Sequence, residues 1–168
     1  MSLRTIRVEG DEILGKVSKP VKEMTARNKQ LISDMLETMY DAQGCGLAAV
    51  QVGILKRIVV IDVGEGPIIL INPVITETSG EQTGYEGCLS VPGKRGIVTR
   101  PEYVKVHALN ENMEEYDVEG TELLARAICH ELAHLDGELY TELVEGALED
   151  VEYDDEFEDE EYDEEFEE

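Results

Sequence analysis

Two of the chain's 3 histidines, His130 and His134, lie four residues apart in the segment HELAH. On an α-helix this spacing places both imidazoles on one face, about one turn apart, where their nitrogens can bind one metal ion. Glu131 follows the first histidine and can act as a general base beside the ion without binding it. Two histidines can also lie together on a helix without any ligand, but the pattern favours a metal-dependent hydrolase.

A catalytic metal site of this kind needs a third protein ligand and an open position. Position 140, where one class of metalloprotease has a third histidine, is Tyr140. Glu142 and Glu145 are carboxylate alternatives, but both follow the histidine pair very closely in sequence. Cys88 is the better candidate because flanking glycines allow its thiolate to approach a helix. Its alternative role is that of a small buried residue, which is how most free cysteines behave.

Two amphipathic helices are predicted from the spacing of apolar residues. In residues 25–41, Leu31, Met35 and Met39 recur at helical spacing between polar residues. In residues 121–136 a similar pattern surrounds the histidine pair, and Gly137 follows as a C-terminal cap. The second helix would therefore carry the metal-binding motif.

Strands and glycine-rich loops are predicted around these helices. Residues 57–63, 67–77 and 97–109 are rich in β-branched side chains and bounded by Gly or Pro, which is typical of strands. Short connections between them indicate antiparallel pairing. Residues 43–53 and 84–90 contain several glycines and are expected to be loops at the site. The predicted fold class is α+β.

The charge distribution divides the chain into two parts. The net charge of −25 disfavours direct binding to nucleic acid or to an anionic membrane. Residues 149–168 contain 15 acids and no base, so we expect residues 1–148 to form the catalytic domain and residues 149–168 a disordered tail. No secretory signal or membrane span is recognised, and 3 cysteines fit a reducing compartment. A cytoplasmic location is predicted.

Three segments together resemble the signature motifs of the bacterial peptide deformylases. They are GCGLAAVQ at 44–51, EGCLS at 86–90 and HELAHLDG at 130–137, in the order and at the approximate separations of that family. The resemblance covers about residues 4–147. It implies an α+β fold in which antiparallel sheets surround a central HExxH-bearing helix, with an N-terminal amphipathic helix. The implied reaction is removal of the formyl group from the N-terminal formyl-methionine of newly made proteins.

The resemblance also implies the roles of the site residues. One divalent ion would be held by three ligands; Fe²⁺ is the usual ion of the family, and Zn²⁺, Ni²⁺ or Co²⁺ can take its place. Glu131 would move the proton between water and the leaving amine, while Gln51 and the backbone N–H of Leu89 would stabilise the oxyanion. The implied ligands are Cys88, His130 and His134.

Several further residues are candidates for binding the substrate. Leu123 and Ala127 precede His130 by seven and three residues, on the same side of the helix, and would border a pocket for methionine. Ordinary helix packing is an equal alternative for both. Gly46 and Gly87 leave room for an extended peptide to pair with exposed backbone. The resemblance places Arg95 near a substrate carbonyl.

The chain departs from the family pattern at two motif positions. Val50 replaces a common proline, which affects loop rigidity, and Ala133 replaces a common aspartate, which removes a polar contact beside the ligands. The expected partners are N-formylmethionyl nascent peptides. A transient ribosome contact is also expected, although the acidic C-terminus excludes the basic C-terminal helix that some members use. The rival functions are an HExxH metallopeptidase and a non-catalytic binding protein.

Overall fold

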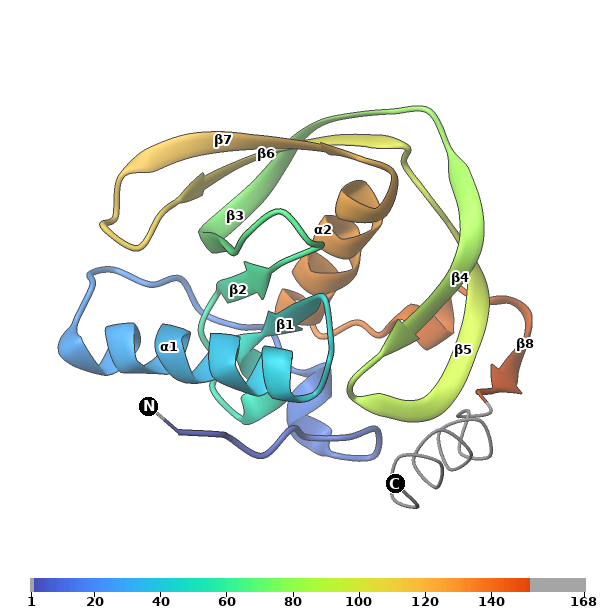
Figure 1. The fold of residues 1–168 in the computed structure, drawn as a ribbon, viewed down its shortest axis with the longest axis horizontal. Coiled ribbons are helices and arrows are strands. Elements are labelled where there is room, and N and C mark those ends of the chain that lie inside the picture. Colours follow the sequence, from blue (N-terminus) through green and yellow to red (C-terminus); the bar gives the residue numbers. More distant parts are fainter. Residues whose placement is uncertain (1, 152–168) are drawn as a thin grey trace, which may run out of the picture.

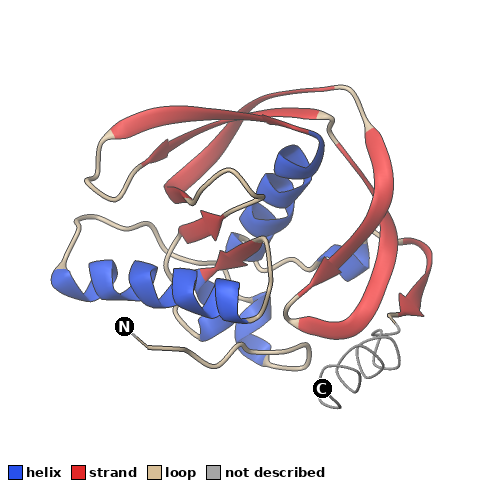
Figure 2. Cartoon of the chain, viewed as in Figure 1, coloured by secondary structure: helices blue, strands red, loops and turns tan. Residues whose placement is uncertain are grey.

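The computed structural model describes residues 2–151, which form two α-helices and two antiparallel sheets (Figures 1 and 2). The predicted α+β class is confirmed. Helix α1 spans Ala26–Asp41 and helix α2 spans Glu122–Leu135. The strands are β1 (Gly46–Ala48), β2 (Ile58–Ile61), β3 (Ile68–Ser79), β4 (Gln82–Cys88), β5 (Val91–Arg100), β6 (Tyr103–Leu109), β7 (Glu115–Thr121) and β8 (Glu145–Asp150).

The larger sheet has the strand order β1-β2-β3-β6-β7 and is covered by a helix on each face near β2. Side chains of successive strand residues point to opposite faces. Val59 and Ile61 therefore join the hydrophobic cluster that includes residues of α2, while Ile58 and Val60 join the cluster that includes residues of α1. This double burial explains why β2 is apolar at every position rather than at alternate ones.

Helix α1 begins at a sequence-encoded cap. The hydroxyl of Thr25 accepts a hydrogen bond from the backbone N–H of Asn28 at 3.1 Å, which satisfies one free N–H of the first turn. Leu31, Met35 and Met39 then lie on the buried face, as their spacing predicts. Burial of this stripe fixes α1 on the sheet beside β1.

The smaller sheet has the order β4-β5-β8 and holds the second part of the site. Figure 1 shows it as a curved ribbon on the opposite side of α2 from α1. Helix α2 contacts strands of both sheets, so a side chain on the correct face of α2 meets residues of β1 and of β4. Gly137, with a φ of 80°, ends this segment as a C-terminal cap.

The structure corrects three of the predicted segments. Residues 43–53, expected to be a loop, contain β1, whose pairing with β2 satisfies its backbone groups, and a single helical turn at Ala49–Val52. Residues 84–90, expected to be a loop, lie mostly in β4, because pairing with β5 satisfies their backbone groups despite the glycines. Residues 97–109, expected to form one strand, are divided between β5 and β6 around Pro101, which has no N–H for a ladder.

The boundary expected between residues 148 and 149 falls inside β8. Glu149 and Asp150 pair with Arg95 and Lys94 of β5, so opposite charges across the strands offset the repulsion that argued for a disordered segment. The rest of the predicted tail, residues 152–168, lies outside the described residues. Within residues 2–151, neither helix has the length and apolar content needed to cross a membrane.

Candidate active site

Helix α2 presents three of the predicted site residues in its last two turns. His130, Glu131 and His134 are all at most 6% exposed. The two imidazole rings lie 5.0 Å apart between centroids, at an interplanar angle of 73°. Their spacing of four residues therefore brings them together, as the sequence analysis expected.

Cys88, at the end of β4, completes the group from the other sheet. Its Sγ lies 3.3 Å from Nε2 of His134, and one donor atom each from Cys88, His130 and His134 lie within 4.8 Å of one another. The two carboxylate alternatives are not part of this group among the described residues. Glu145 instead accepts a hydrogen bond from Thr99 at 2.6 Å on the outside of the smaller sheet.

A thiolate with two imidazoles is a donor set suited to Fe²⁺ or Zn²⁺. The orientation of His130 also fits a ligand, because its Nδ1 lies 2.8 Å from the Glu86 carboxylate and its Nε2 remains directed away from that bond. Nδ1 of His134 is buried and has no hydrogen-bond partner within the described chain. The residues present therefore fit a divalent metal ion.

Glu86 is a buried anion that the sequence analysis did not single out. Its carboxylate accepts hydrogen bonds from Arg100 at 2.6 and 3.0 Å and from Arg126 at 2.8 Å, in addition to its contact with His130. The sequence could have indicated Glu86 in part, because Glu86 and Cys88 lie two residues apart and residues at this spacing share a face of a strand. Arg100 was not predictable in this way, since its contact depends on the pairing of β4 with β5.

These contacts govern the protonation of the buried groups in the metal-free chain. Burial would raise the pKa of Glu86, but hydrogen bonds with Arg100 and His130 outweigh it and lower the pKa to about 2. Burial likewise opposes the charged form of His130, yet the nearby Cys88 and Glu86 raise its pKa to about 10. The pair is thus held as an ionised carboxylate beside an imidazolium.

Burial is the largest cause of the pKa shift at the other two groups. Burial raises the pKa of the Glu131 carboxyl to about 7. Burial and the adjacent positive His130 lower the pKa of His134 to about 3. His134 is therefore neutral and has a nitrogen lone pair available for a ligand.

Glu131 lies directly against β1. A Cβ atom added to Gly46 would come within 2.6 Å of Oε2 of Glu131, so this position has no room for a side chain. The other oxygen, Oε1, is buried without a hydrogen-bond partner in the described residues. A buried polar atom of this kind is costly to leave unpaired.

Gln51 lies in the single turn that follows β1, at 1% exposure. Its Oε1 accepts a hydrogen bond from the Ala48 N–H at 2.9 Å. Its Nε2 donates to Ser90 Oγ at 3.0 Å and lies 3.7 Å from Cys88 Sγ. These contacts fix the amide nitrogen beside the metal-ligand candidate.

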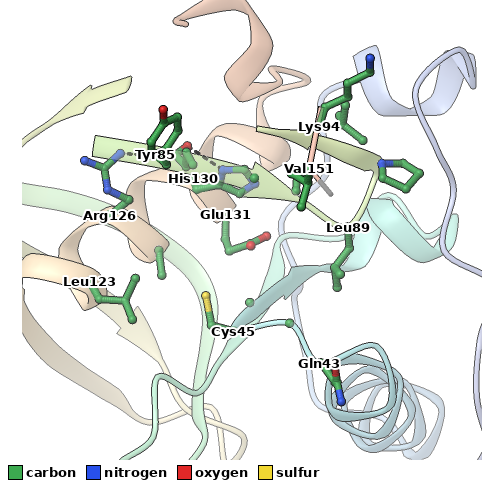
Figure 3. A pocket seen from close by; sticks show the side chains of 18 of the residues that line it. Gln43, Cys45, Tyr85, Leu89, Lys94, Leu123, Arg126, His130, Glu131 and Val151 are labelled. Carbon is green, nitrogen blue, oxygen red and sulfur yellow. Dashed lines mark hydrogen bonds and ion pairs between the residues drawn. The ribbon is translucent and has the colours of Figure 1, made fainter. Parts of the chain in front are cut away.

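A pocket of about 380 Å³ opens over this group of residues. Figure 3 shows Glu131 between His130 and Cys45, with Leu123 and Leu89 on different sides. Of the predicted substrate contacts, Arg95 is not in the lining. The lining includes four of the five predicted substrate contacts: Gly46, Gly87, Leu123 and Ala127.

Arg95 lies beside the pocket rather than in it. Its guanidinium carbon is 3.9 Å from the ring centroid of Tyr85, and Tyr85 lines the pocket. Arg126, by contrast, lines the pocket, and its guanidinium donates a hydrogen bond to Glu86. The sequence analysis did not identify this buried ion pair, which depends on the contact of α2 with β4.

The α+β fold and the group of half-buried Cys88 with buried His130 and His134 beside a glutamate are those of a metal-dependent hydrolase of the HExxH class. The family model described as "Polypeptide deformylase" matches residues 3–148. The chain belongs to the polypeptide deformylase family, whose members are hydrolases that remove the formyl group from the N-terminus of newly made proteins.

Individual relatives agree with this assignment over most of the chain. A peptide deformylase of Agathobacter rectalis is 70% identical over 155 residues, which are 92% of this chain and 98% of the relative. One of Lachnoclostridium phytofermentans is 62% identical, covering 90% of this chain and 94% of the relative. The crystal structure of peptide deformylase from Thermotoga maritima superposes with a TM-score of 0.83 at 40% identity, covering 86% of this chain and 99% of that one.

Proposed function

We propose that this chain deformylates N-formylmethionyl peptides with a divalent ion held by Cys88, His130 and His134. The observation that carries the proposal is the convergence of three ligand atoms within 4.8 Å beside a buried glutamate at the base of a pocket. When bound, such an ion would act as a Lewis acid on a carbonyl group and would lower the pKa of a water molecule to near neutral pH. The donor set accepts Fe²⁺ or Zn²⁺, and Fe²⁺ is the ion we propose from the family resemblance.

Glu131 is proposed as the group that moves protons. Its Oε1 has no partner among the described residues, and its side chain lines the pocket, so it can take a proton from water and deliver it to the leaving amine. The absence of a side chain at Gly46 leaves space for the other oxygen, Oε2. The carboxylate can therefore act without first breaking an internal hydrogen bond at Oε1.

Gln51 and Leu89 are proposed as the donors that stabilise the oxyanion. Nε2 of Gln51 is already directed at Ser90 and Cys88, and its position is fixed through Ala48. Leu89 follows Cys88 directly and lines the pocket. Two fixed N–H groups near the reacting carbon can stabilise negative charge as it develops.

The methionine side chain is proposed to enter between Leu123 and Ala127, beside the aliphatic stem of Arg126. All three residues line the pocket, and an apolar wall with few polar groups suits an unbranched thioether. Gly46 and Gly87 are proposed to leave the peptide backbone room to pair with exposed strand edges. Arg95 is proposed to meet the peptide outside the pocket.

The setting of the reaction is proposed from the substrate. Nascent formyl-methionyl chains are made in the cytoplasm, so the enzyme would act there and meet the ribosome transiently. The last described element is the acidic strand β8, and a ribosome contact would use another surface than a basic C-terminal helix. The proposed catalytic unit extends through Val151, and residues 152–168 remain a proposed tail.

A paired-substrate assay tests the function. The full chain, purified without oxygen, is given formyl-Met-Ala-Ala and unformylated Met-Ala-Ala, and formate and free amino acids are measured separately. We expect formate from the first peptide and no cleavage of either peptide bond. Release of free amino acids would favour the metallopeptidase alternative. No reaction with a metal-loaded protein would favour a binding protein.

Metal content tests the ligand set. Cys88→Ala removes the only proposed thiolate and should abolish stoichiometric metal retention together with activity. His107→Gln is the matched control, because His107 is the remaining histidine and lies on β6 in contact with Asp117 and Glu115. Retention of one metal ion per chain in the Cys88 variant would show that another residue is the third ligand.

A further inference from the structure

The last described strand brings carboxylates against a basic segment of β5. Strands β8 and β5 are antiparallel, with Asp150 opposite Lys94 and Glu149 opposite Arg95. Lys94 forms an ion pair with Asp150, and Nη2 of Arg95 lies 3.6 Å from Oε1 of Glu149. Two cations are thus matched with two anions of the same chain.

This pairing lies at the mouth of the pocket. Lys94 and Tyr85 line the pocket, as does Val151, which follows β8 directly. Val151 donates its N–H to the carbonyl of Gly93 at 2.9 Å, which holds the end of β8 on β5. Figure 3 shows Lys94 and Val151 together on the side of the pocket near Leu89.

Tyr85 connects the second ion pair to the pocket. Its hydroxyl donates to the carboxylate of Glu149 at 3.1 and 3.2 Å, and the Arg95 guanidinium lies over its ring. A peptide that leaves the pocket over this rim therefore meets cations that already have partners. The carboxylates that occupy them are held by the β8–β5 ladder rather than by side-chain contacts alone.

Both ion pairs are accessible to solvent and can be exchanged. The side chains are 46% exposed for Lys94, 77% for Asp150 and about equally exposed, at 45% and 46%, for Arg95 and Glu149. Exposed pairs of this kind are weak, so a substrate carboxylate can compete with them. The competing carboxylates of Glu149 and Asp150 belong to the same chain, so their effective concentration at the two cations is very high.

We propose that Glu149 and Asp150 set the charge preference of the active site, disfavouring formyl-methionyl peptides whose following residues are acidic. The inference rests on the proposed deformylase function and concerns the peptide beyond the methionine. By holding Lys94 and Arg95, the two carboxylates remove the groups that would attract an acidic peptide. Residues 152–168, which continue from Val151 with 13 acids among 17 residues, add charge of the same sign.

The test compares three substrates that differ in one side chain. Formyl-Met-Ala-Glu, formyl-Met-Ala-Ala and formyl-Met-Ala-Lys, each with an amidated C-terminus, are assayed with the full-length metal-loaded enzyme. The measured quantity is kcat/KM for the Glu peptide divided by that for the Ala peptide. For the unaltered chain we expect a ratio below one that rises toward one as salt screens the charges.

The double variant Glu149→Gln/Asp150→Asn keeps the shape of β8 and removes both charges. We expect the ratio to rise about two- to fivefold, the size typical of exposed ion pairs, while kcat/KM for the Ala peptide changes little. Adding Lys94→Met to the double variant should lower the ratio again, because the freed cation is then absent. The matched control is Glu65→Gln/Glu111→Gln, which removes two charges from exposed loop positions outside the pocket.

The outcomes separate the inference from the function on which it rests. An unchanged ratio in the double variant, with normal turnover of the Ala peptide, would overturn the charge preference alone. An equal rise in the control would also overturn it, since net charge and not position would then be responsible. Absence of turnover on every formyl peptide would overturn the proposed function and this inference together.

Discussion

At the scale of single residues, the position of Glu131, the proposed proton carrier, depends on Gly46, which has no side chain. Glu131 packs against the backbone of β1 at Gly46, where any Cβ would lie 2.6 Å from Oε2. Glu131 lines the pocket, and its Oε1 is buried without a hydrogen-bond partner among the described residues. The requirement at Gly46 is steric and concerns the catalytic group as well as the peptide.

The variant Gly46→Ala should lower kcat about 10- to 100-fold, because a shift of about 1 Å in a reacting group has an effect of this size. Metal content should be unchanged, since the three atoms nearest to a Cβ at position 46 all belong to Glu131, which is not a proposed ligand. Gly15→Ala is the control, because a Cβ there meets no atom within 4 Å. Steady-state kinetics and metal analysis of both variants provide the measurement.

A double variant separates displacement of Glu131 from obstruction of the peptide. Glu131→Ala alone should retain metal and lose about 100-fold or more in turnover. If Gly46→Ala acts through the carboxylate, adding it to Glu131→Ala should cause no further loss. An additional loss of the same size as in the single variant would assign Gly46 to peptide binding instead.

Residue types and spacing predicted much of this site. The histidine pair needed only the helical repeat, whereas Cys88 was selected from its glycine-bounded segment and from the family resemblance. The ion pairs of Glu86 with Arg100 and Arg126 were not predictable, because these residues are brought together by the pairing of β4 with β5 and by the packing of α2. Spacing along the chain carries no information about such contacts.

At the scale of elements, α2 and the smaller sheet are joined by a buried ionic contact. Arg126 of α2 donates to Glu86 of β4 at 2.8 Å and to the Val98 carbonyl of β5 at 3.0 Å. Glu86 in turn orients His130. The orientation of one proposed ligand thus depends on how the helix is attached to the sheet.

Arg126→Met should weaken metal binding about 10- to 100-fold, the usual effect of removing a group that orients a ligand. The methionine keeps an apolar stem in the pocket, and Arg100 still neutralises Glu86. Competition with a chelator measures the affinity, and Arg27→Met at an exposed position of α1 is the control. Unaltered affinity in Arg126→Met would limit this arginine to a packing role.

Helix α1 holds the N-terminal segment through Asp34, whose side chain is 3% exposed. Although burial opposes ionisation, hydrogen bonds from the Ser2 N–H, Gln30 and Arg4 hold the pKa of Asp34 below its usual value. Ionised Asp34 therefore favours the folded state. Its contribution is fully present above the unfolded-state pKa and is lost as pH falls through the lower folded-state pKa.

Asp34→Asn should lower the free energy of unfolding at pH 7 by about 1–3 kcal/mol, the size expected for hydrogen bonds to a charged group. The difference between the two proteins should shrink as pH falls below about 4. Urea unfolding at several pH values gives this difference directly. A constant difference between pH 7 and pH 3.5 would show that charge on Asp34 is not its source.

The helices were predicted more closely than the strands, for a physical reason. Helical periodicity located α1 and α2 closely, because one face of each is buried. Residues 84–90 were assigned to a loop because of their glycines, yet the pairing of β4 with β5 outweighs that local preference. Strand formation depends on a partner that is distant in sequence, which local composition does not reveal.

At the scale of the whole molecule, the chain carries its charge unevenly. Its net charge is −25, and 13 of the acids lie in residues 152–168. The strand β8 precedes this segment in the sequence, and its Leu148 packs on the cluster of Val91, Val98 and Tyr140. The domain boundary predicted from the distribution of acidic residues follows residue 148, whereas β8 ends two residues later, at Asp150.

Truncation after Val151 should retain turnover of a neutral formyl peptide and leave the urea midpoint unchanged or slightly raised, since self-repulsion falls. Truncation after Ala147 removes Leu148 and half of β8, and should lower the free energy of unfolding by about 1–2 kcal/mol. The two shortened proteins are controls for each other. Equal stability of both would show that β8 contributes nothing to the fold.

The packing of Glu131 against Gly46 also has a consequence for the order of events during folding. Its two partners are separated by 85 positions, and Cys88 and His134 by 46 positions. Contacts between such distant segments form slowly, because the intervening chain must first be ordered. During refolding, metal uptake should therefore lag behind the appearance of helical structure, and the pocket should be among the last parts of the protein to form.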